Sequence, residues 1–246
     1  MATLIKAFAA QFLGLALAIL LASLAPGLLH GTVRLALLQA TAAAACAYLL
    51  RQPPWWLPIH LLFLPTALAL LSLQLPSGVY LAITLLLALV FWGTVKGDVP
   101  LFLSSSAAAD AVARIIEREN AENFADLGAG IGSLAIPLAR CHPLLAIDAV
   151  ELAPLPWLIT ALRCRKLANI QARRASFWHC GLNAYDVVFA FLSPAVMLKL
   201  SEKISRDMRS GSLFISSSFP IPDWQPESVI TLADRRKTRL YCYRIT

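Results

Sequence analysis

Charge is distributed very unevenly along this chain, and the imbalance limits what its first part can fold into. All 14 acidic residues lie at or after Asp98, whereas residues 1–97 carry four formal charges, all of them basic. With 59% hydrophobic and 14% charged residues, the chain is too apolar for an ordinary soluble protein of 246 residues. We therefore predict two domains, an apolar one over residues 1–97 and a soluble one over residues 98–246.

Four long apolar runs fill the first domain, and none of them contains an acidic residue or a lysine. Each has about the 17 to 25 residues that a helix needs to cross a hydrocarbon core about 30 Å thick. Lipid offers no partner to backbone N–H and C=O groups, so helices are the expected spanning form. The runs predict an all-α transmembrane region of four helices, over residues 7–29, 33–50, 55–75 and 79–95.

The few basic residues of this region predict its orientation. With the N-terminus in the cytosol, Lys6, Arg51 and Lys96 lie inside and only Arg34 lies outside. We therefore predict a multi-pass integral protein of an inner or plasma membrane, with the lipid bilayer as a partner and the soluble domain in the cytosol. A cleaved signal peptide would account for the first run alone, and three more runs follow it.

Cysteine spacing and the basic clusters argue against two other kinds of site. The five cysteines are scattered without a C-x-x-C pair, so we expect neither a metal site nor a disulfide framework. Basic clusters such as Arg235–Lys237 would suit RNA, but beside four apolar runs we expect them to face anionic headgroups or water. No nucleic-acid partner is therefore predicted.

From Asp98 onward, short apolar runs alternate with amphipathic stretches, which is typical of βαβ units in a mostly parallel sheet. A strand over residues 123–127 leads into D-L-G-A-G-I-G at residues 126–132, and a helix over residues 133–141 follows. Three glycines in this spacing allow a sharp strand-to-helix turn and let the backbone approach a ligand closely. The pattern predicts a nucleotide-type binding turn.

An acidic residue, Glu151, follows the next apolar strand, 19 residues after Gly132. A carboxylate at such a strand end accepts both hydroxyls of a ribose. An NAD site normally shows G-x-G-x-x-G, whereas G-x-G-x-G preceded by an acid is typical of class I methyltransferases, where that acid can hold the methionine ammonium of S-adenosylmethionine. We predict an α/β, Rossmann-like, seven-stranded class I methyltransferase domain. Its predicted cofactor-binding residues are Asp126, Gly128, Gly130, Gly132 and Glu151.

The later part of the domain supplies the acceptor side and the closing strands. A strand over residues 186–191 ends in Leu192-Ser193-Pro194, and ligands of open α/β sheets bind beyond the carboxyl ends of strands. This turn is therefore expected beside the transferred methyl group, with residues 228–233 and 240–244 forming a closing hairpin. The candidate catalytic residues are Asp186, Ser193 and Pro194, although Asp186 begins its strand and a structural role for it stays open.

Three segments carry a resemblance to a known family: D-L-G-A-G-I-G at 126–132, Y-D-V-V-F-A-F-L-S-P at 185–194 and S-F-P-I-P-D-W at 218–224. With the apolar N-terminal region, they resemble the mitochondrial lysine methyltransferases that modify the adenine nucleotide carrier and the membrane-ring protein of ATP synthase, and their bacterial relatives. The similarity covers about residues 98–246. It implies that the glycine motif holds the amino acid end of the cofactor, Glu151 the ribose, and residues 186–194 the acceptor.

Two departures from that family's pattern bear on the prediction. The family usually has V-P-[FY]-V-P-[ST] before the first helix of the domain, and this chain has V-P-L-F-L-S at residues 99–104, which puts the protein substrate in doubt. Where the family commonly has Gly-Asp-Phe-Phe, this chain has A-S-F-W, so Ser176 replaces an aspartate expected near the adenine amino group. We expect that Ser176 hydrogen-bonds the adenine or that the cofactor binds more weakly.

Three functions stay open at this point. The first is N-methylation of a lysine on a membrane protein, in which the ammonium must lose a proton before the methyl group is transferred in line. The second is methylation of a small hydrophobic or lipid-like acceptor dissolved in the bilayer. The third is a non-catalytic membrane scaffold that retains the fold. The family resemblance favours the first.

Overall fold

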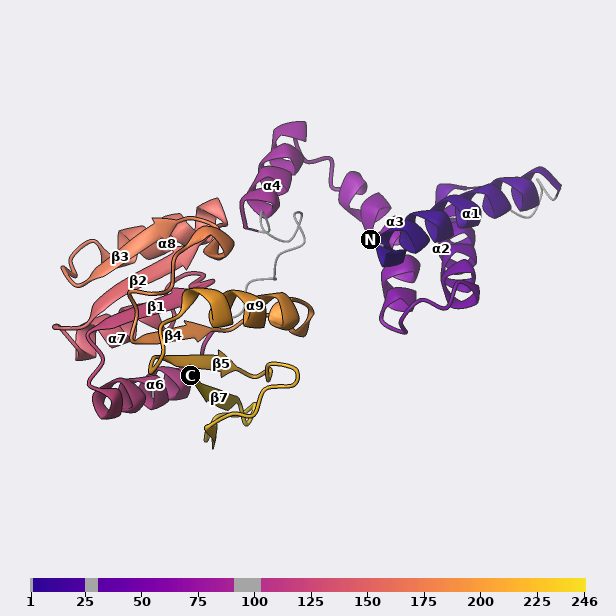
Figure 1. The fold of residues 1–246 in the computed structure, drawn as a ribbon. Helices are drawn as coiled ribbons and strands as arrows, with labels where there is room; N and C mark the ends of the chain where they lie inside the picture. The colour runs from indigo at the N-terminus through magenta and orange to yellow at the C-terminus, as the bar shows by residue number, and fades with distance from the viewer. Residues whose placement is uncertain (1, 25–30, 91–102) are drawn as a thin grey trace. The chain divides into compact units, whose positions relative to one another are not determined.

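A computed structural model of the chain describes residues 2–24, 31–90 and 103–246. Two compact units can be distinguished, Met1–Leu81 and Ala82–Thr246, and Figure 1 labels most of their helices and strands. The predicted boundary after residue 97 lies outside the described residues and stays a prediction. Four helices come first in the chain: α1 (Ala2–Leu24), α2 (Thr32–Leu49), α3 (Trp56–Ser72) and α4 (Ser77–Val90).

Small residues form the contact between α1 and α2, and large apolar side chains point outward. A Cβ atom at Gly14 would lie 2.6 Å from the backbone N of Ala43, so the two helices approach each other at backbone distance. Phe8, Phe12 and Leu37 are more than half exposed. Such close packing of small residues is typical of helix pairs in lipid. The other buried alanines are Ala7, Ala10 and Ala18 on α1, and Ala36, Ala40, Ala42, Ala44 and Ala47 on α2.

A chain of polar side chains links α1, α2 and α3. Gln39 Nε2 donates a hydrogen bond of 2.7 Å to Gln11 Oε1, and Nε2 of Gln11 lies 2.9 Å from His60 Nδ1. His60 Nε2 lies 3.3 Å from Oε1 of Gln52, in the connection between α2 and α3. Gln39 and His60 are buried. In apolar surroundings such hydrogen bonds help to hold the three helices together.

Two of the four predicted spans are confirmed as helices long and apolar enough to cross a membrane. Among the described residues these are Ile5–Leu24, with 20 residues, and Thr32–Leu49, with 18. The apolar helices α3 and α4 have 17 and 14 residues. The fourth predicted run continues to residue 95, outside the described residues. The four-span arrangement therefore stays a prediction.

The second unit is built on a seven-stranded mixed sheet in the order β3-β2-β1-β4-β5-β7-β6. Strands β1 to β5 run parallel, and β7 lies antiparallel between β5 and β6. This confirms the predicted seven-stranded, mostly parallel sheet and its closing hairpin. The strands are β1 (Asn123–Leu127), β2 (Ala146–Glu151), β3 (Ile170–Arg174), β4 (Val187–Ala190), β5 (Leu213–Ser217), β6 (Ser228–Thr231) and β7 (Arg239–Arg244).

Helices cover both faces of the sheet and bury a core on each. Side chains alternate along β1, so that Phe124 belongs to one core, and Ala125 and Leu127 belong to the other. The core around Phe124 takes in α6 (Ser106–Glu119) and α7 (Ala135–Cys141). The opposite core takes in α9 (Pro194–Asp207), beside β4 in Figure 1. The remaining elements are α8 (Pro154–Cys164) and the short 3-10 helix η1 (Phe177–His179).

Candidate cofactor and acceptor site

The parallel strands β1 to β4 all end at one edge of the sheet, called here the carboxyl edge, and the glycine motif lies there. Gly128, Gly130 and Gly132 have φ values of 77°, 58° and 74°, a region that residues with a Cβ rarely adopt. A Cβ atom at Gly128 would lie 3.0 Å from Cδ2 of Leu192, in the connection after β4. Residues 128–132, called here the glycine bend, therefore pack closely against the predicted acceptor turn.

Glu151 ends β2 with its carboxylate turned into the glycine bend. Its Oε2 accepts a 2.9 Å hydrogen bond from the backbone N–H of Gly130, and its Oε1 accepts one of 2.7 Å from Ala153 N–H. The residue is half-buried. An acceptor-only carboxylate at the end of the strand beside β1 is the group that a ribose diol requires. The predicted pairing of the bend with Glu151 thus has a matching geometry.

Asp126 lies behind the bend, near the end of β1, and is 3% exposed. Burial is the main reason that the pKa of Asp126 is raised to about 7, and the nearby charge of Glu151 raises it further. A hydrogen bond from the backbone N–H of Ala135, at the start of α7, acts in the opposite direction. The carboxyl group can therefore change its charge near neutral pH, and a bound ammonium group would favour the ionised form.

Two side chains of α8 hold the bend from the other side, and the sequence pattern did not single them out. Thr160, which is buried, donates a hydrogen bond of 2.9 Å from Oγ1 to the carbonyl of Gly130. Arg163 donates to the carbonyl of Ile131. The signal that could have found Thr160 is a hydroxyl on a helix face that otherwise packs into the core.

The acceptor turn lies at the same edge. Ser193 is the N-cap residue of α9, its side chain makes no capping hydrogen bond, and Pro194 occupies the first helical position. Both follow Leu192, whose side chain contacts the bend at Gly128. The structure therefore brings Ser193 and Pro194 together with the predicted cofactor residues.

Ser176 also lies at the carboxyl edge, after β3 and directly before η1. The backbone N–H of Ala175 donates a hydrogen bond of 3.2 Å to the carbonyl of Glu151, which ties this segment to the end of β2. Ser176 is half-buried. A position beside the end of β2 agrees with the adenine-side role that the resemblance implies.

Asp186 does not join this group. It precedes β4 at the opposite edge, where its Oδ2 accepts hydrogen bonds from the backbone N–H groups of Glu122, at 2.9 Å, and Asn123, at 2.8 Å. Its other carboxylate oxygen accepts from Arg209. Since β1 and β4 start at the same edge, this carboxylate satisfies the free donors at the start of β1. We therefore exclude Asp186 from the proposed catalytic set.

A cavity of about 190 Å³ opens beside the acceptor turn. Its walls include Ser105, Phe191, Ser217 and Asp234. The backbone N–H of Ser104 donates a hydrogen bond of 3.1 Å to Ser133 Oγ, directly after the glycine bend. Ser105 Oγ donates one of 3.0 Å to Asp234 Oδ2 in the β6–β7 connection. Ser104 and Ser105, directly before α6, therefore link the end of the glycine bend to the β6–β7 connection. The sequence pattern did not reveal this link.

Comparisons with known proteins find relatives of this domain. Residues 126–228 match the family described as the ANTKMT methyltransferase domain. The adenine nucleotide translocase lysine N-methyltransferase of Mus musculus is 31% identical over 110 residues, which cover 43% of this chain and 47% of that protein. The lysine N-methyltransferase of the ATP synthase c-ring protein of Homo sapiens is 29% identical over 112 residues, covering 44% of this chain and 46% of that protein. The chain thus matches about half the length of these relatives.

A solved structure has a similar fold. The RNA methyltransferase from Salinibacter ruber, in complex with S-adenosyl-L-homocysteine, has a TM-score of 0.53 at 20% identity, covering 58% of this chain and 94% of that one. Such a likeness concerns the fold alone. Residues 126–228 therefore carry an ANTKMT methyltransferase domain with an S-adenosylmethionine-binding fold, distantly homologous to lysine N-methyltransferases of the adenine nucleotide translocase and of ATP synthase.

Proposed function

We propose that this protein transfers a methyl group from S-adenosylmethionine to the side-chain amine of a lysine on a membrane protein. The observation that carries the proposal is the Glu151 carboxylate bonded to Gly130 N–H within the glycine bend, in the segment homologous to lysine N-methyltransferases. The cofactor supplies an electrophilic methyl group on a sulfonium centre. The chain itself must bind the cofactor, orient the amine and let the amine lose its proton.

Each cofactor-binding role follows from the position of a residue at the carboxyl edge. Glu151 has an acceptor-only carboxylate for the two ribose hydroxyls, and the glycine bend lets the backbone approach the amino acid moiety. Asp126 provides negative charge toward the methionine ammonium, directly or across the bend. Ser176 takes the adenine side, where its hydroxyl can hydrogen-bond.

The acceptor amine is proposed to enter beside the turn after β4. Only the neutral amine carries a lone pair that can attack the methyl carbon, so the site must hold a lysine after it has lost its proton. The hydroxyl of Ser193, which makes no capping bond, can accept a hydrogen bond from that amine. Pro194 lacks a backbone N–H donor, and its ring restricts the backbone of the turn at the start of α9.

The membrane part of the proposal rests on the first unit. Ile5–Leu24 and Thr32–Leu49 are long and apolar enough to cross a bilayer. Their small residues face each other while large apolar side chains lie outside, a pattern that suits lipid better than water. We propose a multi-pass anchor with the methyltransferase domain in the cytosol. Relatives named for two specific lysine substrates support a lysine acceptor here.

The test is transfer of radiolabel from S-adenosylmethionine to isolated membranes by the full chain. Wild type should label a membrane polypeptide, and acid hydrolysis should release the label as methyl-lysine. Glu151→Ala should abolish the labelling. Glu202→Ala is the matched control, because Glu202 is an exposed carboxylate of α9 without an ion pair in the described part of the chain.

Other outcomes of this experiment overturn the proposal. Label that extracts with lipid solvents would identify a small hydrophobic acceptor instead. Tight binding of S-adenosylhomocysteine without any transfer to membranes would favour a scaffold that retains the fold. Unchanged labelling by Glu151→Ala would reject the assigned cofactor site.

A further inference from the structure

Two adjoining cavities form a continuous groove next to the acceptor turn. The cavity of about 190 Å³ and a second one of about 570 Å³ share Phe191, Arg236 and Thr238 in their walls. Phe191 directly follows β4, and Phe219, after β5, adds a second aromatic wall. The smaller cavity also includes Ser104, which is hydrogen-bonded to Ser133 after the glycine bend. This groove, called here the acceptor groove, therefore lies next to the acceptor turn and the glycine bend.

Four cations line the outer part of the groove. They are Arg235, Arg236 and Lys237 in the β6–β7 connection and Arg239 at the start of β7. All four are exposed, and none forms an ion pair with a described residue. Positive charge is thus concentrated at the mouth of the groove without a partner from this part of the chain.

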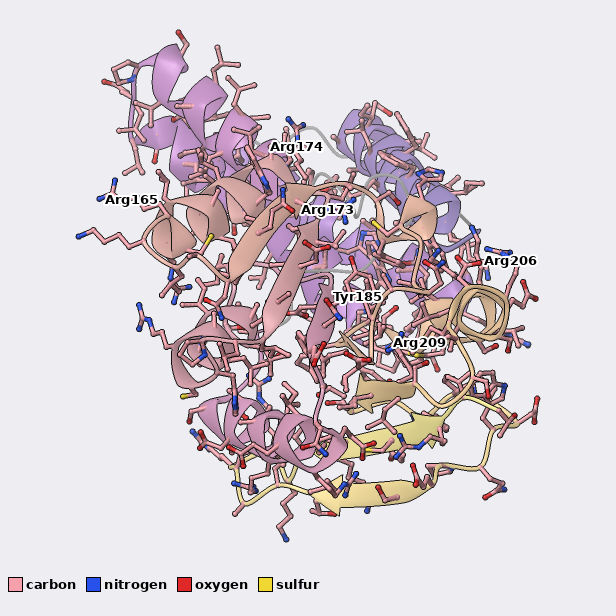
Figure 2. All side chains as sticks on the ribbon, turned by 60° about the vertical axis from the view of Figure 1, so that its left-hand side comes forward. Arg165, Arg173, Arg174, Tyr185, Arg206 and Arg209 are labelled. Carbon is pink, nitrogen blue, oxygen red and sulfur yellow. The ribbon has the colours of Figure 1, made fainter. Side chains whose placement is uncertain are left out.

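Several arginines elsewhere in the domain pair with carboxylates. Figure 2 labels five of them together with Tyr185. Arg173 pairs with Asp148 at 2.9 Å, and Arg206 pairs with Asp207 at 2.8 Å. Arg209 pairs with Asp186. The four groove cations lack such carboxylate partners among the described residues.

Asp234 is the acidic residue among the groove-lining residues named above, and its hydrogen bonds stabilise the β6–β7 connection. Its carboxylate accepts hydrogen bonds from Ser105 Oγ, from Thr238 N–H at 2.8 Å and from Thr238 Oγ1 at 2.7 Å. Bonds from the Thr238 backbone and side chain are the main reason that its pKa lies below the usual range. These bonds hold the backbone of the connection, so its exposed cations stay at the mouth of the groove and remain available to a ligand.

We propose that the acceptor groove binds the polypeptide segment beside the target lysine, and that carboxylates of this segment pair with Arg236 and Lys237. The inference deepens the proposed function and rests on it. A groove that begins beside the acceptor turn, at Phe191, and has two aromatic walls and four cations suits an extended peptide with acidic side chains. An anionic lipid surface would need only exposed cations, and the aromatic walls and the link to the glycine bend would then have no role.

The test uses two synthetic peptides that carry a central lysine flanked by either four glutamates or four arginines. We expect the full chain in detergent micelles to methylate the glutamate peptide with a kcat/KM about tenfold higher, mainly through a lower KM. This preference should shrink in 0.5 M NaCl, which is roughly three times the physiological ionic strength, because salt screens the attraction between exposed charges. The double variant Arg236→Glu/Lys237→Glu should abolish the preference, because the two introduced carboxylates balance the remaining charges of Arg235 and Arg239.

A matched control carries the same change of charge at the other edge of the sheet. Arg165 and Lys166 follow α8, both are exposed, and Arg165 projects outward in Figure 2. Arg165→Glu/Lys166→Glu should keep the preference of wild type. Binding of S-adenosylhomocysteine, measured by calorimetry for each variant, shows whether the domain is folded. If the charge reversal prevents folding, Arg236→Gln/Lys237→Gln should still weaken the preference.

The outcomes separate this inference from the proposed function. If wild type methylates both peptides equally and charge reversal has no effect, the inference fails while lysine methylation stands. If wild type binds the cofactor but methylates neither peptides nor membranes, both fail. If the Arg236 and Lys237 variant loses binding to phosphatidylserine vesicles while its peptide kinetics match wild type, the groove serves a lipid surface and the inference is overturned.

Discussion

The backbone N–H of Gly130 donates a 2.9 Å hydrogen bond to Oε2 of Glu151. This bond connects the turn after β1 to the end of β2, which lies beside β1 in the sheet. It places a carboxylate where the glycine backbone is open, and both groups are of the kind that a nucleoside cofactor requires. The interaction therefore supplies the first test of the proposed site.

Replacing Glu151 by glutamine should weaken the binding of S-adenosylhomocysteine by about tenfold or more. The amide keeps the shape of the side chain but loses the charge and one of the two acceptor oxygens, and charge-assisted hydrogen bonds are the stronger ones. Calorimetric titration of the full chain in micelles measures the change. Glu202→Gln, an exposed carboxylate of α9, should bind like wild type. If Glu151→Gln binds S-adenosylhomocysteine as tightly as Glu202→Gln does, Glu151 is not a cofactor-binding residue.

Gly128→Ala and Gly211→Ala form a second matched pair. Both glycines have positive φ, 77° and 85°, so each substitution should cost about 1 kcal/mol in backbone strain. Only at Gly128 does the new Cβ approach another side chain, 3.0 Å from Leu192 Cδ2, and at Gly211 nothing lies within 4 Å. We expect similar losses in thermal stability but a loss of cofactor affinity for Gly128→Ala alone. A parallel loss of affinity in Gly211→Ala would show that strain, and not the site, is responsible.

Local patterns made the core of the site predictable. The strand, the glycine bend and Glu151 lie within 29 residues, from Asn123 to Glu151, and each has a fixed relation to a βα unit. Ser193 and Pro194 were predicted in the same way, as the turn after a strand. Asp186 lies at the start of its strand as predicted, and the sequence left open whether its role is catalytic or structural because its partners are distant in sequence. Its carboxylate binds backbone N–H groups more than 60 positions away, so only the fold reveals its structural role.

The parts of the site that the sequence did not reveal depend on long-range contacts. Ser105 and Asp234 are 129 positions apart, and Thr160 bonds to a carbonyl 30 positions away. Serines and threonines are common on surfaces and in loops, so their type alone carries no signal. In the first unit, hydropathy predicted helices but not the pairing of α1 with α2. That pairing follows from small residues such as Gly14 meeting across the interface.

The pKa of Asp126 predicts a pH dependence of stability with a defined sign. It is about 7 in the folded protein against 3.8 ordinarily, so between these values the folded state binds more protons than the unfolded state. The free energy of unfolding should therefore fall as the pH rises from about 4 to about 7, by on the order of 4 kcal/mol. Hydrogen exchange of the slowest amides of β1 and β4 measures this decline. In Asp126→Asn the part of the decline that comes from this carboxyl group should be absent. Identical pH profiles of stability for wild type and Asp126→Asn would contradict the raised pKa of Asp126.

Cofactor binding should depend on pH in the opposite direction. If the carboxylate of Asp126 attracts the methionine ammonium, affinity for S-adenosylhomocysteine should rise as the pH increases through about 7 and Asp126 ionises. The comparison ligand is 5′-methylthioadenosine, which lacks the amino acid moiety and should bind with a flat profile over the same range. A rise of equal size for both ligands would show that Asp126 does not act on the ammonium.

Gly14→Ala should separate α1 from α2, whereas Gly78→Ala should leave the first unit intact. Both substitutions favour a helix by about 1 kcal/mol through intrinsic propensity. At Gly14 the added Cβ would lie 2.6 Å from the backbone N of Ala43, which cannot move independently of α2, whereas Gly78 has nothing within 4 Å. Overpacking of this kind costs about 1–3 kcal/mol. Hydrogen exchange in micelles should show peptides of α1 and α2 exchanging about tenfold faster or more in Gly14→Ala alone. Unchanged protection would mean that the helices do not pack through these small residues.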